Sequence, residues 1–146
     1  MMEVVKTAVY DGLVDIVGFR QTYKLGLDYH GVIDADPEFV KLANYLMEHG
    51  SEVHILTGSR ETVELHDQLK ALGIKYTRLF SVASHHEALG THMWYTDPQN
   101  PWMDAEVWNR SKADYCREHG INLMVDDSDV YGQYFTTPYI RYRKKS

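Results

Sequence analysis

The chain has 146 residues, 44% hydrophobic and 25% charged, which suits one globular domain over residues 1–146 and excludes disorder or a fibrous repeat. Lysine and arginine number 15 against 21 aspartate and glutamate, and the net charge of −6 argues against polynucleotides or anionic membranes as partners of the bulk surface. No run approaches the roughly 20 apolar residues of a membrane-spanning helix, and residues 1–6 lack the apolar centre of a signal peptide, so we expect a cytoplasmic protein.

Residues 1–20 predict a β-hairpin extension. Two β-rich runs, residues 3–10 and 13–19, are joined by Asp11 and Gly12, and Asp-Gly between apolar runs is a strong signal for a two-residue hairpin turn. Beyond this extension, short apolar runs alternate with helical stretches, which is typical of βαβ units with a parallel sheet.

The first of these units has clear boundaries. The run at residues 24–28 predicts a strand, and Asp36 followed by Pro37 is typical of a helix N-cap and first helical position. We therefore expect a helix over residues 37–49, with Gly50 as its end.

The second unit follows the same plan. Residues 53–57 predict a strand, and the next helix ends at Gly73 after three leucines at helical spacing, namely Leu65, Leu69 and Leu72. A third apolar run, at about residues 76–82, is the candidate for another strand.

Residues 91–108 show no clear period and are interpreted as a long loop or small insertion. Its tryptophans, Trp94, Trp102 and Trp108, are expected to be packing residues. Nearby histidines lack partner acids at a metal-binding spacing and are expected in a solvated loop; they are His85, His86 and His92. His54 alternates into a strand and is expected to be a hydrogen-bonded sheet residue.

The last part of the chain predicts a helix from Lys112 to His119, a stop at Gly120 and a strand over residues 121–125. Residues 138–142 are the candidate for an edge strand, and a frayed basic end is expected at Arg143, Lys144 and Lys145. The whole pattern predicts an α/β fold, a three-layer α/β/α sandwich with a mostly parallel, Rossmann-like sheet.

Polar residues gather where the predicted strands end. Ligands of open parallel sheets bind beyond the carboxyl ends of the strands, so these residues are the candidates for a site. They are Asp28 and His30, then Thr57, Gly58 and Ser59, then Asp126 and Asp127, with Lys112 ahead of the last strand. Carboxylates for a divalent cation, donors for an anion and one ammonium together suit the handling of a phosphate.

The order and type of these residues resemble the haloacid dehalogenase-like superfamily, whose phosphatases act through an aspartyl-phosphate. Its four motifs are an apolar strand ending in Asp-x-Asp-Gly, a strand ending in Thr or Ser, a Lys or Arg, and a strand ending in paired acids. The matching positions span roughly residues 24–131 and are Asp28 to Gly31, Thr57, Lys112 and Asp126 with Asp127.

The resemblance implies a magnesium-dependent phosphomonoester hydrolase with Asp28 as nucleophile. Mg²⁺ would be held by Asp28, the His30 carbonyl, Asp126 and Asp127, while Thr57 and Lys112 bind the phosphoryl oxygens. His30 stands where the family's phosphatases have a second Asp, and it would transfer the proton because an imidazole titrates near neutrality. The backbone N–H groups of Gly58 and Ser59, at a helix N-terminus, would be further anion donors and substrate-binding groups.

Two alternatives stay open at this level. The first is a binding module, a catalytically weak relative that keeps the metal and anion pocket. The second is a dehalogenase: the family's dehalogenases also lack the second Asp, but the paired acids disfavour this reading because the reaction needs no divalent metal. Only 29 positions separate Asp28 from Thr57 (57 − 28), so no cap domain fits there, and residues 91–108 are the candidate for a modest lid. A phosphorylated small molecule or nucleotide is the expected partner, and a nucleic-acid end or phosphoprotein is also compatible with an open site.

Overall fold

The computed structural model describes residues 22–97 and 100–144, and the predicted N-terminal hairpin lies outside them. Its centre is a five-stranded sheet in the order β3-β2-β1-β6-β7, and all four ladders are parallel. The strands are β1 (Lys24–Asp28), β2 (Glu52–Thr57), β3 (Arg78–Ser81), β6 (Leu123–Asp126) and β7 (Tyr139–Arg141). The predicted α/β fold with a mostly parallel sheet is confirmed.

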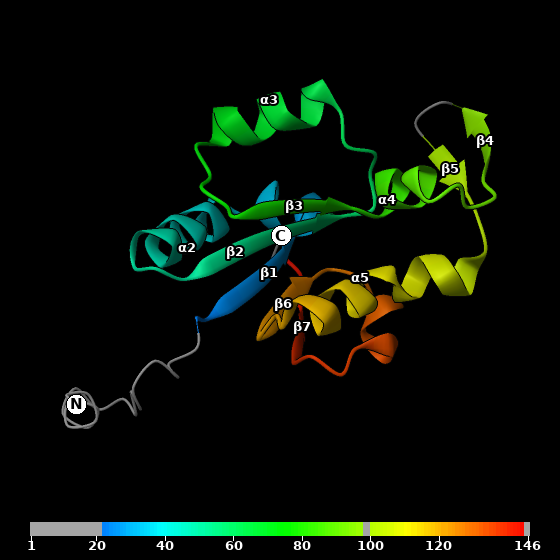
Figure 1. Cartoon of the computed structure of the whole chain (residues 1–146). Helices are drawn as coiled ribbons and strands as arrows, with labels where there is room; N and C mark the ends of the chain where they lie inside the picture. Colours follow the sequence, from blue (N-terminus) through cyan, green and yellow to red (C-terminus); the bar gives the residue numbers. More distant parts are fainter. Residues whose placement is uncertain (1–21, 98–99, 145–146) are drawn as a thin grey trace.

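Helices cover both faces of this sheet and make three layers (Figure 1). Those on one face are α2 (Pro37–Glu48) and α3 (Val63–Leu72), and the opposite face carries α5 (Ala105–His119). A short helix, α4 (Val82–Ala88), follows β3 and contacts α5. Among residues 22–97 and 100–144, every helix is too short or too polar to cross a bilayer.

The alternation of side chains along β1 separates two hydrophobic cores. Leu25 and Leu27 pack into the larger core with residues of α2 and α3, whereas Gly26 faces Met124 in the smaller core beside α5. A Cβ atom on Gly26 would lie 2.8 Å from the Met124 sulfur, so the glycine lets β6 and α5 pack closely. The period of two along a strand thus fixes which face each residue serves.

Capping residues set the helix boundaries, and they confirm the first two predicted helices. Asp36 accepts a hydrogen bond from the Glu38 N–H, and Thr62 accepts one from the Leu65 N–H. Gly73 ends α3, as predicted, and adopts the left-handed conformation. The predicted start of the last helix at Lys112 is wrong.

That last helix, α5, begins at Ala105, because the Asp104 carboxylate accepts the Val107 N–H and caps it. Its first turns are rich in polar side chains and hide the apolar spacing, which is why the sequence pattern places the start seven residues too late. Lys112 therefore lies in the middle of a helix, on the same face as Trp108 and Cys116, four residues away on either side.

The stretch over residues 91–108 is only partly a loop. It holds an antiparallel pair of strands, β4 (Trp94–Asp97) and β5 (Asn100–Trp102), in which Trp94 lies opposite Trp102. Figure 1 shows this pair beyond α4 and the N-terminal end of α5. The third predicted strand is also shorter than expected, because Ser81 caps α4 and ends the extended run there.

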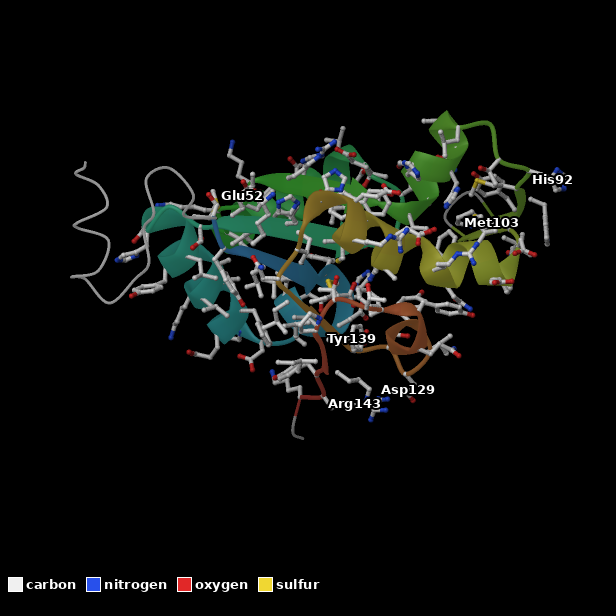
Figure 2. All side chains as sticks on the ribbon, turned by 60° about the horizontal axis from the view of Figure 1, so that its bottom comes forward. Glu52, His92, Met103, Asp129, Tyr139 and Arg143 are labelled. Atoms are coloured by element: carbon white, nitrogen blue, oxygen red, sulfur yellow. The ribbon has the colours of Figure 1, made fainter. Side chains whose placement is uncertain are left out.

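The predicted edge strand is confirmed by the parallel pairing of β7 with β6. The frayed basic end is wrong for the two residues that the structure describes. Arg143 lies beside Asp129, with 2.9 Å between Nη2 and Oδ1 (Figure 2). Lys144 donates to the Ala35 carbonyl at 2.6 Å, so both residues are tied to the domain.

Candidate functional site

Three strands end in polar side chains at one edge of the sheet. Asp28 is the last residue of β1, Thr57 of β2 and Asp126 of β6. These strands are neighbours in the sheet, so the parallel topology brings the three side chains to the same place. All are buried, with 5%, 1% and 0% exposure for Asp28, Thr57 and Asp126.

Lys112 connects two of these strand ends. Its Nζ atom lies 2.8 Å from Asp28 Oδ1 and 2.8 Å from Asp126 Oδ2, and the residue is only 3% exposed. The same Nζ atom lies 5.2 Å from the centre of the Tyr131 ring, within the range of a cation–π contact. The mid-helix position of Lys112 in α5 makes this reach to the sheet edge possible.

A third carboxylate completes an acidic cluster. Oxygen atoms of Asp28, Asp126 and Asp127 all lie within 4.8 Å of one another. Carboxylate oxygens are the ligands that Mg²⁺ and Ca²⁺ prefer, so the donor set fits a hard divalent cation. Asp126 already accepts hydrogen bonds from Lys112 and from the Ser128 N–H, whereas Asp127 lines the open cavity.

The cluster brings three carboxyl groups close to one ammonium. Burial raises the pKa of Asp28 to about 8, and the neighbouring charge of Asp126 and the contact with the Asp127 carboxyl act in the same direction, against Lys112. The pKa of Lys112 is raised by its two carboxylate partners, despite its burial. Lys112 therefore carries a proton, and the raised pKa of Asp28 favours the protonated acid near neutral pH.

A wide turn, η1 (Tyr29–Ile33), carries the chain out of the site directly after Asp28. Within it Gly31 has φ 85°, and a Cβ atom there would lie 2.1 Å from Asp127 Oδ2. Any other residue would push that carboxylate away, so the glycine is needed both for its backbone conformation and for space. The turn that follows Asp28 thus brings Gly31, after the end of β1, against Asp127, after the end of β6.

His30 reaches the cavity from the same turn, and its partner was not predicted. Its side chain is 69% exposed, and Nδ1 lies 2.7 Å from Asp34 Oδ2. The other oxygen of Asp34 accepts the Gly31 N–H at 2.8 Å. Asp34 therefore holds both the backbone of the turn and the orientation of the imidazole, and its position four residues after His30 was the only available signal.

The predicted anion donors after β2 are partly wrong. Gly58 and Ser59 line the cavity, but α3 does not begin until Val63, so they are not at a helix N-terminus. The Ser59 N–H donates to Thr57 Oγ1 at 3.1 Å and is used within the loop. Thr57 retains its own hydroxyl proton for a ligand, because that bond uses the oxygen only as an acceptor.

The site opens into a cavity of about 730 Å³. Its lining includes most of the predicted residues, namely Asp28, His30, Thr57, Gly58, Ser59, Lys112 and Asp127. It also includes side chains that sequence reasoning had treated only as packing or had not considered, above all Trp102, Met103, Trp108, Asn109 and Tyr131. Figure 2 labels Met103, which lies in the chain between β5 and α5.

Two buried histidines are structural. His54 is buried between the Tyr115 hydroxyl and Glu52, at 2.7 and 2.8 Å, which confirms the expected sheet role. The expected solvated position of His86 is wrong, because it lies in α4 at 7% exposure and its Nε2 is 2.8 Å from Ser111 Oγ. Burial lowers the pKa of both imidazoles, which keeps them neutral.

Comparison with protein-family models, curated proteins and solved structures finds no match to this chain. The chemistry of the site is therefore read from its own residues. They are carboxylates, a buried ammonium and a hydroxyl at one sheet edge, below a cavity with an aromatic wall.

Proposed function

We propose that the protein is a Mg²⁺-dependent phosphomonoester hydrolase that acts through an aspartyl-phosphate on Asp28. The observation that carries this proposal is the position of Lys112, whose Nζ atom lies 2.8 Å from both Asp28 and Asp126 at the inner end of the cavity. Burying a lysine between two acids costs desolvation free energy, which favours a functional role for this contact. It suits a site that must hold a nucleophile and a phosphoryl group together.

A divalent cation fits the oxygen donors of this site. Asp28, Asp126 and Asp127 would hold it, with the His30 carbonyl as a further oxygen ligand. When bound, Mg²⁺ supplies positive charge that offsets the repulsion between a substrate phosphate and these carboxylates. The raised pKa of Asp28 supports this reading, because a cation bound beside the carboxyl group would displace its proton and leave Asp28 ionised.

Asp28 supplies the nucleophile. One of its carboxylate oxygens attacks phosphorus, and the phosphorus–oxygen bond to the leaving group breaks with both electrons going to the leaving oxygen. Water then attacks the phosphorus of the aspartyl-phosphate, which releases inorganic phosphate and regenerates the Asp28 carboxylate. Splitting the reaction in this way replaces one difficult displacement by two easier ones.

Thr57 and Lys112 act on the transferred group. The Thr57 hydroxyl at the end of β2 and the Lys112 ammonium both line the cavity beside Asp28. They would donate to the phosphoryl oxygens as charge shifts among them, which stabilises the transition state. Lys112 also holds Asp28 in one orientation through their 2.8 Å contact, so the attacking oxygen is positioned before substrate binds.

His30 moves the protons. In its protonated form it gives a proton to the leaving oxygen, which departs as an alcohol, and in its neutral form it takes one from the attacking water. Asp34 fixes the ring through its 2.7 Å contact with Nδ1, which leaves the Nε2 atom to face substrate. This pair is the feature that favours an enzyme over a binding module, which has no need of proton transfer.

Phosphate release tests the proposal. The purified protein is incubated with a panel of phosphomonoesters in Mg²⁺ and, separately, in chelator, alongside Asp28→Asn. We expect release in Mg²⁺ only, and a loss of at least about a hundredfold in the variant, because an amide is a poor nucleophile. Wild-type protein that binds Mg²⁺ and hydrolyses nothing in the panel would instead support the binding module.

A further inference from the structure

We propose that the aromatic wall of the cavity binds a nucleobase, so that the substrates are nucleoside monophosphates. This inference rests on the proposed phosphatase function and names its substrate class. It is carried by three aromatic side chains that line the same cavity as the carboxylates, namely Trp102, Trp108 and Tyr131.

The wall begins next to the phosphoryl site. The Tyr131 ring centre lies 5.2 Å from Lys112 Nζ, and the Tyr131 hydroxyl accepts a hydrogen bond from Trp108 Nε1 at 3.1 Å. Trp108 in turn contacts the loop after β2, since a Cβ atom on Gly58 would lie 3.2 Å from its ring. A phosphate bound by Lys112 and Thr57 would therefore have aromatic rings beside its ester group.

Trp102 extends this wall at its exposed end. The residue is 53% exposed although it lines the cavity, so a flat apolar ligand would remove a large indole surface from water. Its Nε1 donates to Thr96 Oγ1 at 3.3 Å, which ties the indole to the β4–β5 pair. Trp94, directly opposite in that pair, is similarly exposed at 51% but does not line the cavity.

The strand pair that carries Trp102 is anchored to the body of the domain. Tyr95 in β4 donates a hydrogen bond to Glu87 of α4. The same Glu87 binds Arg60 in the loop after β2, with 3.1 Å between Arg60 Nε and Glu87 Oε1. The Arg60 guanidinium also lies 5.2 Å from the Tyr95 ring centre. Trp102 is therefore presented by a fixed element, as a preformed subsite requires.

Size, charge and polarity favour a mononucleotide. The cavity volume of about 730 Å³ lies within the range of small-molecule sites. The net charge of −6 disfavours a long polyanion. The side-chain amide of Asn109, in the same lining, makes no hydrogen bond with the described part of the chain, and it offers both donor and acceptor to a base edge or a ribose hydroxyl. Because every base has an aromatic face, we expect purines and pyrimidines to bind alike.

Binding of phosphonates tests this inference without turnover. A nucleoside phosphonate, in which carbon replaces the bridging oxygen, cannot be hydrolysed at phosphorus, and its dissociation constant is measured by calorimetry with Mg²⁺. The comparisons are propylphosphonate, with no ring, and phenylphosphonate, with a ring but no nucleoside. We expect the nucleoside phosphonate to bind about tenfold more tightly than propylphosphonate. Equal binding, or tightest binding of phenylphosphonate, would overturn the inference.

Matched variants locate the subsite. Trp102→Ala should reduce the preference for the nucleoside phosphonate to within about threefold, Trp102→Phe should keep part of it, and Trp94→Ala should keep all of it. An equal loss in both alanine variants would contradict a role for Trp102 in particular. Melting temperatures close to wild type show that the variants fold.

The two proposals fail in different ways. Nucleoside preference in binding without hydrolysis of any phosphomonoester would leave the base subsite standing and remove the phosphatase. Hydrolysis of alkyl phosphates and nucleotides with equal KM, unaffected by Trp102→Ala, would leave the phosphatase standing and remove the base subsite.

Discussion

Lys112 and Asp28 are 84 positions apart in the chain, yet their Nζ and Oδ1 atoms lie 2.8 Å apart in a buried contact. The contact exists because the middle of α5 passes behind the carboxyl end of β1 while Gly26 and Met124 allow close packing on that face. Asp126 Oδ2 accepts a hydrogen bond from the same Nζ atom, also at 2.8 Å. One lysine therefore holds Asp28 at the end of β1 and Asp126 at the end of β6.

Removal of that ammonium should destabilise the fold. In Lys112→Met two acids lose their buried partner, and we expect the free energy of unfolding in metal-free buffer to fall by about 3 kcal/mol. Urea denaturation measures the loss. The control is Lys41→Met, whose partner Glu38 and whose own side chain are both mostly exposed, and it should stay near wild type. Equal losses in the two variants would contradict the role of Lys112.

The raised pKa of Asp28 predicts a pH-dependent stability. It lies at about 8 against an ordinary value of 3.8, so its contribution is complete below about pH 4 and is lost as pH rises through about 8. Asp28→Asn lacks this titration. In chelator, the stability of the variant relative to wild type should therefore increase between pH 5 and pH 9, as urea denaturation at both values would show. A difference that is constant with pH would rule out the raised pKa.

Mg²⁺ should raise the melting temperature of the wild type, because a ligand of the native state stabilises it by mass action. Asp127→Asn removes a carboxylate that lines the cavity and should abolish most of this shift. Asp129→Asn changes an exposed acid that pairs with Arg141 and Arg143, and its Mg²⁺ response should match wild type. Thermal scans with and without Mg²⁺ test both, and a full response in Asp127→Asn would show that this acid is structural.

Two glycines with the same φ of 85° separate backbone strain from the contact with Asp127. Gly50 has open space around it, whereas a Cβ atom on Gly31 would lie 2.1 Å from Asp127 Oδ2. Gly50→Ala should cost about 1–2 kcal/mol of stability from strain alone. Gly31→Ala should cost more and also weaken Mg²⁺ binding, measured by calorimetry, because the carboxylate must move. Unaltered Mg²⁺ binding in Gly31→Ala would contradict this geometry.

His30 should matter most for poor leaving groups. His30→Ala should slow hydrolysis of alkyl phosphates by about a hundredfold and of p-nitrophenyl phosphate far less, because the phenolate departs without a proton. Asp34→Asn should shift the same ratio in the same direction by a smaller factor. The control is His66→Ala, an exposed histidine paired with Glu61 outside the cavity. An unchanged alkyl-to-aryl ratio in His30→Ala would show that the imidazole is not the acid and that only the backbone carbonyl of His30 has a role.

The site residues at the strand ends were predictable from the sequence. A polar residue that directly follows an apolar run identifies the carboxyl end of a parallel strand. Asp28, Thr57 and Asp126 are such residues, and each ends a strand in the structure. The helix caps Asp36 and Gly73 were predictable for the same reason, since their signals are local.

Features that depend on tertiary contacts were not predictable. The first turns of α5 hold several polar residues among Ala105, Val107 and Trp108, so the apolar period does not mark its start, and the sequence places the beginning of the helix at Lys112 rather than at Ala105. The aromatic wall needs Trp102, Trp108 and Tyr131 from three elements to face one cavity. No spacing in the sequence encodes that convergence, and the tryptophans therefore resembled ordinary packing residues.

The central claim is an aspartyl-phosphate on Asp28, and the most direct test is acid quenching of the protein during turnover of a phosphomonoester in Mg²⁺, followed by peptide mass spectrometry. We expect one phosphoryl group on the peptide that contains Asp28, absent in chelator and absent in Asp28→Asn. Sustained phosphate release with no phosphoryl group on that peptide at any quench time, and with Asp28→Asn still active, would contradict it.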